Sequence, residues 1–247
     1  MYYLIFLIGL FIGSFLNVCI YRIPRGDSLV LSRSRCPSCG HVLKWWELMP
    51  VISFLILRGK CSECGEKISW YYTLVEIFTA IIFLILYIKF GLTYYFYIYA
   101  FLFSVLFVLS GIDLAFGVIP DIITIPMIFI GFVFSLIFNH INFLDSLFGI
   151  IAGGGILLLI AYLSKGGMGG GDIKMMAMVG AFTGWEIAIT SIFLGAFLGA
   201  VNGLILIKIS NKDMKSALPF GPYLSLGALI SILYYQRILD FYLDLIL

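Results

Sequence analysis

The chain has 247 residues, of which 62% are hydrophobic and only 11% are charged, and its mean hydropathy is +1.12. A soluble domain of this size carries about twice that charged fraction. The composition therefore excludes an ordinary soluble protein and predicts an all-α, polytopic membrane protein. The net charge of +2 is too small to suggest a nucleic-acid partner.

Seven apolar runs are long enough to cross a hydrocarbon core, which needs about 20 residues of helix. An eighth run is short for a span, but the charges of the loops on either side of it require a crossing. The eight predicted spans are roughly residues 2–21, 70–88, 95–112, 122–138, 144–163, 173–183, 186–207 and 218–235. The first run lacks the charged and cleavable flanks of a signal peptide, so we expect it to remain as a span.

The Lys and Arg residues predict the orientation of these spans. If the amino terminus lies outside, 13 of the 15 basic residues fall in the inner segments 22–70, 113–121, 164–174 and 208–217. Leaving out the short span would invert every later loop and move three lysines outside. The pattern therefore predicts that both termini lie outside and that the polar loops below lie on the cytoplasmic side.

Residues 22–69 form one extended polar region that carries two Cys-x-x-Cys pairs with 21 residues between them. Each pair can form a turn that presents two thiolates to one ion, and two such turns complete a tetrahedral zinc site of the structural type. The predicted ligands are Cys36, Cys39, Cys61 and Cys64. Two redox-active dithiols are the alternative, although no thioredoxin-like pattern flanks the cysteines.

The segment between the cysteine pairs, residues 45–57, is apolar and begins with two tryptophans. It is too short to cross the bilayer. An amphipathic helix in the membrane interface is therefore a better interpretation than a crossing.

The third predicted span ends at Asp113, and Asp121 follows eight residues later, directly after Pro120. Proline disfavours helix for the residue before it and can start the next helix, so Asp121 is interpreted as a capping acid near a helix amino terminus. Asp113 has no such explanation. A carboxylate at the end of an apolar helix is costly unless it is solvated, paired or used, which makes Asp113 a candidate functional residue.

Asp172 follows five glycines that are spread over six positions, between two long apolar runs. The same cost makes it a functional candidate. Glycine has no Cβ, so it would let an extended peptide approach closely beside the acid. The alternatives are a flexible loop between helices and a phosphate-binding turn, and the second is disfavoured because no strand precedes the glycines.

Asp113 and Asp172 are predicted at the same membrane face. Two carboxylates brought together in a partly dry site hold one proton between them over a broad pH range. The ionised acid can then take a proton from water while the protonated acid hydrogen-bonds a scissile carbonyl, as in aspartic proteases. The sequence permits this pairing without showing that the two acids meet.

Several motifs occur in a fixed order along nearly the whole chain. They are Gly13-Ser14-Phe15-Leu16-Asn17-Val18, Tyr21-Arg22-Ile23-Pro24, the paired cysteines around Trp45-Trp46-Glu47-Leu48-Met49-Pro50, Leu74-Val75-Glu76, Asp113 with Ile119-Pro120-Asp121, and Gly169-Gly170-Gly171-Asp172-Ile173-Lys174. Together they resemble the type IV prepilin leader peptidases, which belong to the Gly-x-Gly-Asp intramembrane aspartyl proteases.

The resemblance implies a prepilin peptidase with Asp113 and Asp172 as the catalytic pair and Gly169 and Gly171 as the glycines of the motif. It also implies that the four cysteines bind Zn²⁺. The substrates would be prepilins or pseudopilins, cut at the cytoplasmic face of the inner cell membrane just before their hydrophobic helix. Many members also methylate the new amino terminus with S-adenosyl-L-methionine, for which the residues here show no binding pocket.

The predicted organisation is a first transmembrane helix (1–21), a cytoplasmic zinc-binding domain (22–69) and a membrane-embedded aspartyl peptidase domain (70–247), with membrane lipid around the spans. One competing function is an ion-coupled transporter, which would need internal repeats and an acid near the bilayer midplane. Another is a non-catalytic, zinc-dependent assembly scaffold. The sequence does not predict which pilin-like substrate is cut or the oligomeric state.

Overall fold

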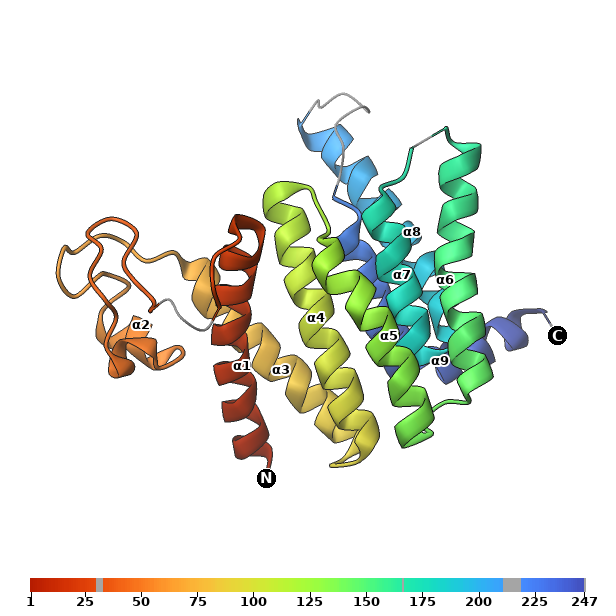
Figure 1. Ribbon diagram of the computed structural model, residues 1–247, viewed down its shortest axis with the longest axis horizontal. Coiled ribbons are helices and arrows are strands. Elements are labelled where there is room, and N and C mark those ends of the chain that lie inside the picture. Colours follow the sequence, from red (N-terminus) through yellow and green to blue (C-terminus); the bar gives the residue numbers. More distant parts are fainter. Residues whose placement is uncertain (30–32, 166, 211–218, 247) are drawn as a thin grey trace. The chain divides into compact units, whose positions relative to one another are not determined.

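The computed structural model describes residues 1–29, 33–165, 167–210 and 219–246, and all structural statements below refer to these residues. They form helices that are joined by short loops, apart from the long connection over residues 23–69, and the described ranges contain no strand (Figure 1). The prediction of an all-α, polytopic membrane protein is confirmed. The chain divides into two compact units, Met1–Phe96 and Tyr97–Leu247.

The first unit contains two long helices that pack against each other, α1 (Tyr2–Arg22) and α3 (Trp70–Phe90). Two glycines one turn apart on α1 face the backbone of α3. A Cβ on Gly9 would lie 2.5 Å from the Cα of Ala80, and one on Gly13 would lie 2.7 Å from the Cα of Glu76. Small residues of this kind let membrane helices approach closely, where van der Waals packing holds them together.

The loop between these helices contains the short 3₁₀ helices η1 (Ile23–Arg25) and η2 (Trp45–Leu48) and the five-residue helix α2 (Ile52–Ile56). The prediction of one continuous interfacial helix over residues 45–57 is therefore wrong, because this segment forms two short helices with a break between them. The break falls at Pro50, which has no N–H, and at Val51, whose φ is +60°. The N–H of Val51 instead donates to Glu76 Oε2 at 2.8 Å, which ties the loop to α3.

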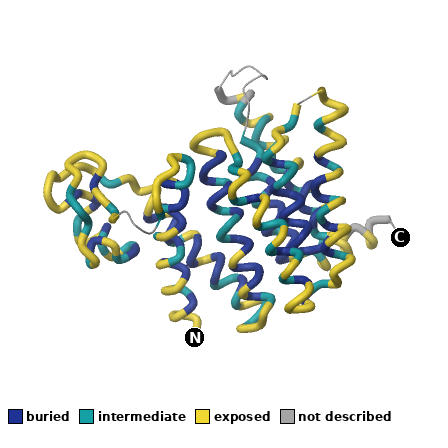
Figure 2. The backbone as a smooth tube through the Cα atoms, in the orientation of Figure 1, coloured by how far each residue is buried: buried dark blue, intermediate teal, exposed yellow. Residues whose placement is uncertain are grey.

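The second unit contains most of α4 (Tyr94–Phe116) and all of α5 (Asp121–Phe138), α6 (Phe143–Leu163), α7 (Gly170–Thr183), α8 (Trp185–Ser210) and α9 (Gly221–Ile246). Its core is the short helix α7, which contacts α5, α6, α8 and α9. Every residue from Met175 to Thr183 is buried, and Figure 2 shows the buried residues gathered there.

Glycines set how deeply α7 lies among its neighbours. A Cβ on Gly180 of α7 would lie 2.0 Å from the carbonyl oxygen of Gly149 on α6, and a Cβ on Gly153 would lie 2.3 Å from that of Met176. No other residue could occupy these positions without moving one helix. The α6–α7 contact therefore fixes the position of the helix that begins beside Asp172.

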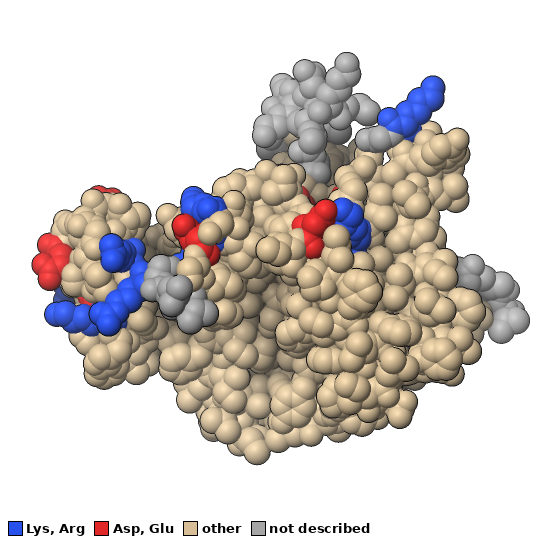
Figure 3. All heavy atoms as spheres, viewed as in Figure 1, with Lys and Arg blue, Asp and Glu red and all other residues tan. Residues whose placement is uncertain are grey.

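Among the described residues, six helices are long and apolar enough to cross a membrane, namely α1, α3, α4, α5, α6 and α8. On the face drawn in Figure 3, the charged side chains of the second unit lie at one end of its helices, and the flanks carry none. Large apolar side chains such as Phe129 and Phe193 are exposed instead, as expected of a surface that faces lipid. The chain is therefore a multi-pass membrane protein.

The two remaining predicted spans correspond to α7 and α9. Helix α7 has 14 residues, which is short for a crossing, and α9 carries Arg237, Asp240 and Asp244 in its second half. Their crossings stay predictions, and so do the orientation and the division at residues 21 and 69. The lysines at 212 and 215, which entered the orientation argument, lie outside the described residues.

Candidate active site and metal centre

Asp113 lies near the end of α4 and is 7% exposed. Its Oδ2 accepts a hydrogen bond of 2.9 Å from the N–H of Gly221, the first residue of α9. This N–H is one of the helix-start groups that have no acceptor within the helix. One turn earlier on α4, Ser110 donates to Ser225 Oγ of α9 at 2.7 Å. Asp113 is thus held at the junction between the end of α4 and the start of α9.

Asp172 lies in the first turn of α7 and is 8% exposed. Its carboxylate accepts a hydrogen bond from the N–H of Gly169, the residue that caps this helix. An acid at the third helical position often binds the capping residue in this way. A Cβ on Gly169 would lie 3.1 Å from Asp172 Oδ2, so a glycine at this position leaves room for the carboxylate.

The two carboxylates lie close enough to interact, since the charge of Asp113 acts on the carboxyl group of Asp172. The structure therefore brings together the two acids whose meeting the sequence only permitted. They come from different helices, and each is bound by the N–H of a glycine at the start of a helix.

Ile119, in the loop between α4 and α5, packs against Gly171, which precedes Asp172, and against Gly221, which binds Asp113. A Cβ on Gly171 would lie 2.7 Å from the Cβ of Ile119, and a Cβ on Gly221 would lie 3.2 Å from its Cδ1. The isoleucine therefore fills the space between the start of α7 and the start of α9. A side chain at Gly171 would clash with Ile119, so this packing requires a glycine. The sequence analysis had explained the glycines differently, by the close approach of a substrate peptide.

Asp121 is the first residue of α5, which confirms that it lies at a helix amino terminus. Its Oδ2 forms an ion pair of 2.6 Å with Nζ of Lys174, two residues after Asp172. The sequence analysis missed this partner and the Gly221 donor. The signals were the lysine that ends the glycine motif and the Gly221-Pro222 pair, which is typical of a helix start.

The four predicted metal ligands, Cys36, Cys39, Cys61 and Cys64, converge with all Sγ atoms within 4.8 Å of one another. The Cys36–Cys64 and Cys39–Cys61 sulfur distances are both 3.9 Å. A disulfide would need about 2.05 Å. Four thiolates about 2.3 Å from a tetrahedral Zn²⁺ lie about 3.8 Å apart, so the cluster fits zinc. The N–H groups of Cys39 and Ser38 lower the pKa of Cys36 to about 6, whereas burial and the neighbouring thiols raise the pKa of Cys39 and Cys64, so a bound metal ion would itself have to deprotonate these two thiols.

The two cysteine pairs form nearly identical turns. The N–H of Cys36 and that of Cys61 each donate to the carbonyl five residues later, at 2.9 and 2.8 Å. Gly40 and Gly65 follow the second cysteine of each pair with φ of +74° and +71°, a conformation that favours glycine. The sequence Cys-x-x-Cys-Gly thus encodes the same local geometry twice.

Glu47 joins the two turns from the segment between them. The carboxylate binds the N–H of Lys44 at 2.7 Å, Nε2 of His41 at 3.1 Å and the hydroxyl of Ser62. Burial alone would raise the pKa of Glu47, but these hydrogen bonds lower it to about 2. Glu47 is therefore a buried, ionised cross-link of the cysteine-bearing loop.

Comparison with known proteins gives two matching family models. Residues 7–90 match the bacterial peptidase A24 N-terminal domain, and residues 100–204 match the type IV leader peptidase family. A prepilin leader peptidase/N-methyltransferase of Pseudomonas aeruginosa is 35% identical over 270 residues, which cover 96% of this chain and 92% of the relative. The chain belongs to the type IV leader peptidase family. A Bacillus subtilis protein of the same name is 33% identical over 99% of this chain and 98% of its own length.

No solved structure matches this leader peptidase. The two matched ranges follow the division of the structure, since the first lies within the first unit and the second within the second unit. The second range contains both Asp113 and Asp172. The chain is therefore a multi-pass membrane peptidase, and the buried Asp113 and Asp172 lie in the part that matches the leader peptidase family.

Proposed function

We propose that this leader peptidase is an intramembrane aspartyl endopeptidase that removes the leader peptide of type IV prepilins or pseudopilins. Asp113 and Asp172 are its catalytic pair. The observation that carries the proposal is the proximity of two buried carboxylates from different helices of the second unit, close enough for the charge of Asp113 to act on Asp172. The names of the relatives, which identify prepilin leader peptidases, support the substrate class.

In the proposed mechanism one acid of the pair is ionised and the other carries a proton. The ionised acid takes a proton from a water molecule while the protonated acid hydrogen-bonds the scissile carbonyl. The water oxygen bonds to the carbonyl carbon, the C–N bond then breaks, and the leaving amine receives a proton. The N–H groups of Gly169 and Gly221 each bind one of the acids and so orient the pair.

Substrate access at Gly171 requires a change around Ile119, because this side chain packs against Gly171 and Gly221. An extended peptide that displaces Ile119 would meet Gly171, which has no Cβ, next to Asp172. The motif glycines would then serve two states, packing on Ile119 at rest and accepting the peptide backbone during cleavage.

We place the cut at the cytoplasmic face of the inner cell membrane. The supporting observations are the distribution of Lys and Arg along the sequence and the position of both acids at helix ends. A leader that stays in the cytosol and a pilin helix that enters from the lipid would meet the acids at that level.

The four cysteines would hold a structural Zn²⁺, since they supply four thiolates and leave no open coordination position. The metal would hold the two turns of the loop together.

The N-methyltransferase part of the relatives' names supports methylation of the new amino terminus as a second activity. Its donor would be S-adenosyl-L-methionine. The cavity of the cysteine-bearing loop is lined by Arg33 and Lys44 without a carboxylate, so it does not fit a positively charged sulfonium. We therefore assign no residue to the donor.

The test is cleavage of a co-expressed prepilin, read as the mass of its mature amino terminus. Asp113→Asn and Asp172→Asn should each abolish cutting, while Asp121→Asn, which removes only an exposed partner of Lys174, should retain it. Methylation would add about 14 Da, one methylene, to the wild-type product.

Continued cutting by both Asn variants would overturn the aspartyl mechanism and bring back the transporter and scaffold alternatives. Loss of cutting in Asp121→Asn as well would instead assign a larger role to the ion pair. Cys61→Ser reports separately on the metal centre.

A further inference from the structure

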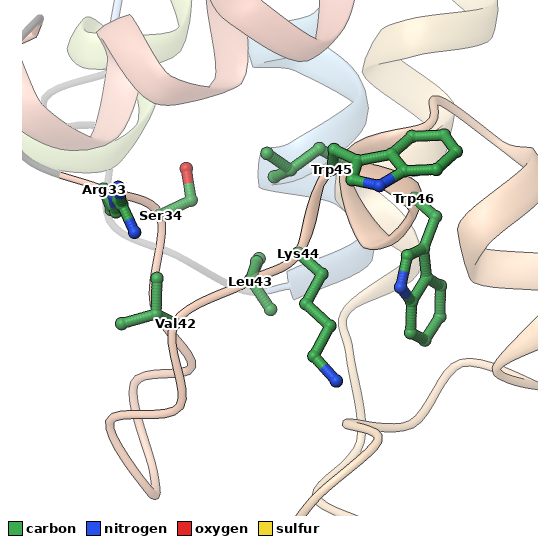
Figure 4. A pocket seen from close by; sticks show the side chains of 8 residues that line it. Arg33, Ser34, Val42, Leu43, Lys44, Trp45 and Trp46 are labelled. Carbon is green, nitrogen blue, oxygen red and sulfur yellow. The ribbon is translucent and has the colours of Figure 1, made fainter.

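We propose that the cysteine-bearing loop binds the phosphate of an anionic membrane lipid. The site is a cavity of about 570 Å³ whose lining includes Arg33, Ser34, Lys44, Trp45, Trp46 and Leu48. Figure 4 shows the two tryptophans side by side at one edge of this group and Arg33 and Ser34 at the other. Neither the peptidase mechanism nor the zinc site uses these residues.

The charge of the cavity selects an anion. Arg33 and Lys44 line it, and no acidic residue does. Within the described ranges, neither base forms an ion pair with a carboxylate. Glu47, three residues after Lys44, does not line the cavity, and its carboxylate is bound by the N–H of Lys44, by His41 and by Ser62. A phosphate would provide the missing negative charge.

The edge of the cavity favours a lipid over a soluble anion. Trp45 is 77% exposed and Leu48 is 43% exposed, although both side chains are large and apolar. Tryptophan is enriched where the bilayer meets water, because its ring is apolar and its N–H can reach the headgroups. A free phosphate ion would not cover these side chains, whereas a lipid brings acyl chains with its phosphate.

The loop is tied to a helix that enters the membrane. The Phe54 ring packs on Trp70, the first residue of α3, with ring centroids 4.6 Å apart. The N–H of Val51 binds Glu76, within the same helix. Three apolar side chains of α2 are also exposed: Ile52, Leu55 and Ile56. The segment that carries the cavity therefore continues into an apolar surface beside the start of a candidate span, as an interfacial segment would.

The experiment uses the purified full-length chain in a zwitterionic detergent. Short-chain phosphatidylglycerol, with six-carbon acyl chains, is titrated and its binding is followed by tryptophan fluorescence. Arg33→Gln combined with Lys44→Gln should weaken binding about 10- to 30-fold, since each base near an anionic headgroup contributes about fivefold. The matched control removes two bases of the same loop that do not line the cavity, Lys60→Gln with Lys67→Gln, and should bind as the wild type does.

Arg33→Lys with Lys44→Arg keeps both charges and should bind within about threefold of the wild type, which separates lost charge from lost folding. Zinc content and helical circular dichroism are measured for every variant. Short-chain phosphatidylcholine and inorganic phosphate should bind weakly. Equal weakening in the control pair, or full competition by inorganic phosphate, would overturn the proposal. This binding test does not depend on cleavage, so its outcome is independent of the proposed peptidase mechanism.

Discussion

The four-cysteine cluster and the acid pair are both built from residues far apart in the sequence, but they are assembled in different ways. Each cysteine pair forms its own turn from a local motif, and the two turns then meet. Asp113 instead binds a distant partner, the N–H of Gly221 at the start of α9, and Asp172, which is bound by the nearby Gly169, comes close to Asp113 only through the packing of the helices. The geometry of a turn can be predicted from its own sequence motif, whereas the geometry of a site between helices depends on how the whole unit packs.

The two sites should therefore fail in different ways. Loss of one of the four cysteines should unfold the cysteine-bearing loop and leave the helices folded, because the loop has few buried apolar contacts of its own. Loss of an acid should remove activity and leave the structure, while a change in helix packing far from the acids should disturb both. The following predictions test this difference, from the largest expected effect to the smallest.

Removal of the metal should unfold the loop alone. Structural zinc contributes an apparent ~10–16 kcal/mol to small zinc-binding folds. Cys61→Ser, or a strong chelator, should expose Arg58, Lys60 and Lys67 to trypsin and leave the helical circular dichroism almost unchanged. Cys19→Ser, in α1, is the matched control and should stay protected. A loop that resists trypsin without metal would show that zinc does not hold it.

Replacement of either acid should remove catalysis without unfolding. Asp113→Asn and Asp172→Asn should each lower the cleavage rate by about 10³-fold or more, because acid–base groups contribute about 10²–10⁴-fold and these two act together. Asparagine still offers an oxygen to the N–H of Gly221 or Gly169, so the melting temperature should hardly change. The double variant should be no slower than the slower single variant. Multiplying effects would show that the acids act independently.

A larger residue at the α6–α7 contact should disturb the fold of the second unit. Gly180→Leu should lower the free energy of unfolding by about 3 kcal/mol or more, because its Cβ would lie 2.0 Å from the Gly149 carbonyl oxygen. It should also reduce cleavage, since α7 carries Asp172. Gly155→Leu is the control, because no atom lies within 4 Å of a Cβ at that position. Equal effects of the two substitutions on thermal unfolding would contradict the packing argument.

Neutralisation of Glu47 should weaken the loop in a pH-dependent way. The folded pKa of about 2 is below the ordinary 4.5, so this acid stabilises the loop fully above pH 4.5 and loses the effect as the pH falls towards 2. Glu47→Gln should destabilise the loop by about 1–3 kcal/mol at neutral pH. Amide exchange at Lys44 is compared between variant and wild type from pH 6 to pH 3, and the difference should narrow as the pH falls. A difference that stays constant across this range would show that the charge is unimportant.

The Asp121–Lys174 ion pair should have the smallest effect. Its side chains are 54% and 39% exposed, and exposed pairs contribute about 0–1 kcal/mol. Asp121→Asn and Lys174→Met should each change the cleavage rate by less than about fivefold. The exchanged pair, Asp121→Lys with Lys174→Asp, should recover most of any loss. A loss of about 10²-fold that the exchange restores would instead show that the ion pair positions the acids.

The sequence by itself determined the membrane class, most helix boundaries and the four cysteines that form a cluster able to hold a metal ion. Apolar runs report directly on burial in lipid, and the repeated Cys-x-x-Cys-Gly fixes its turn through local hydrogen bonds. It also identified Asp113 and Asp172 as acids whose position needed an explanation. Their catalytic role stays a proposal that the cleavage experiment tests.

Only the tertiary structure decided how these acids are held. Nothing near Asp113 in the sequence indicates that its partner is the N–H of Gly221, and nothing near Asp121 indicates Lys174. The same holds for Pro50 and Val51, where the loop breaks because the N–H of Val51 binds Glu76 of α3. Contacts between separate helices depend on which faces of the helices pack together. Here Gly149 of α6 and Gly180 of α7 let these two helices pack closely, because each leaves space for the backbone of the other.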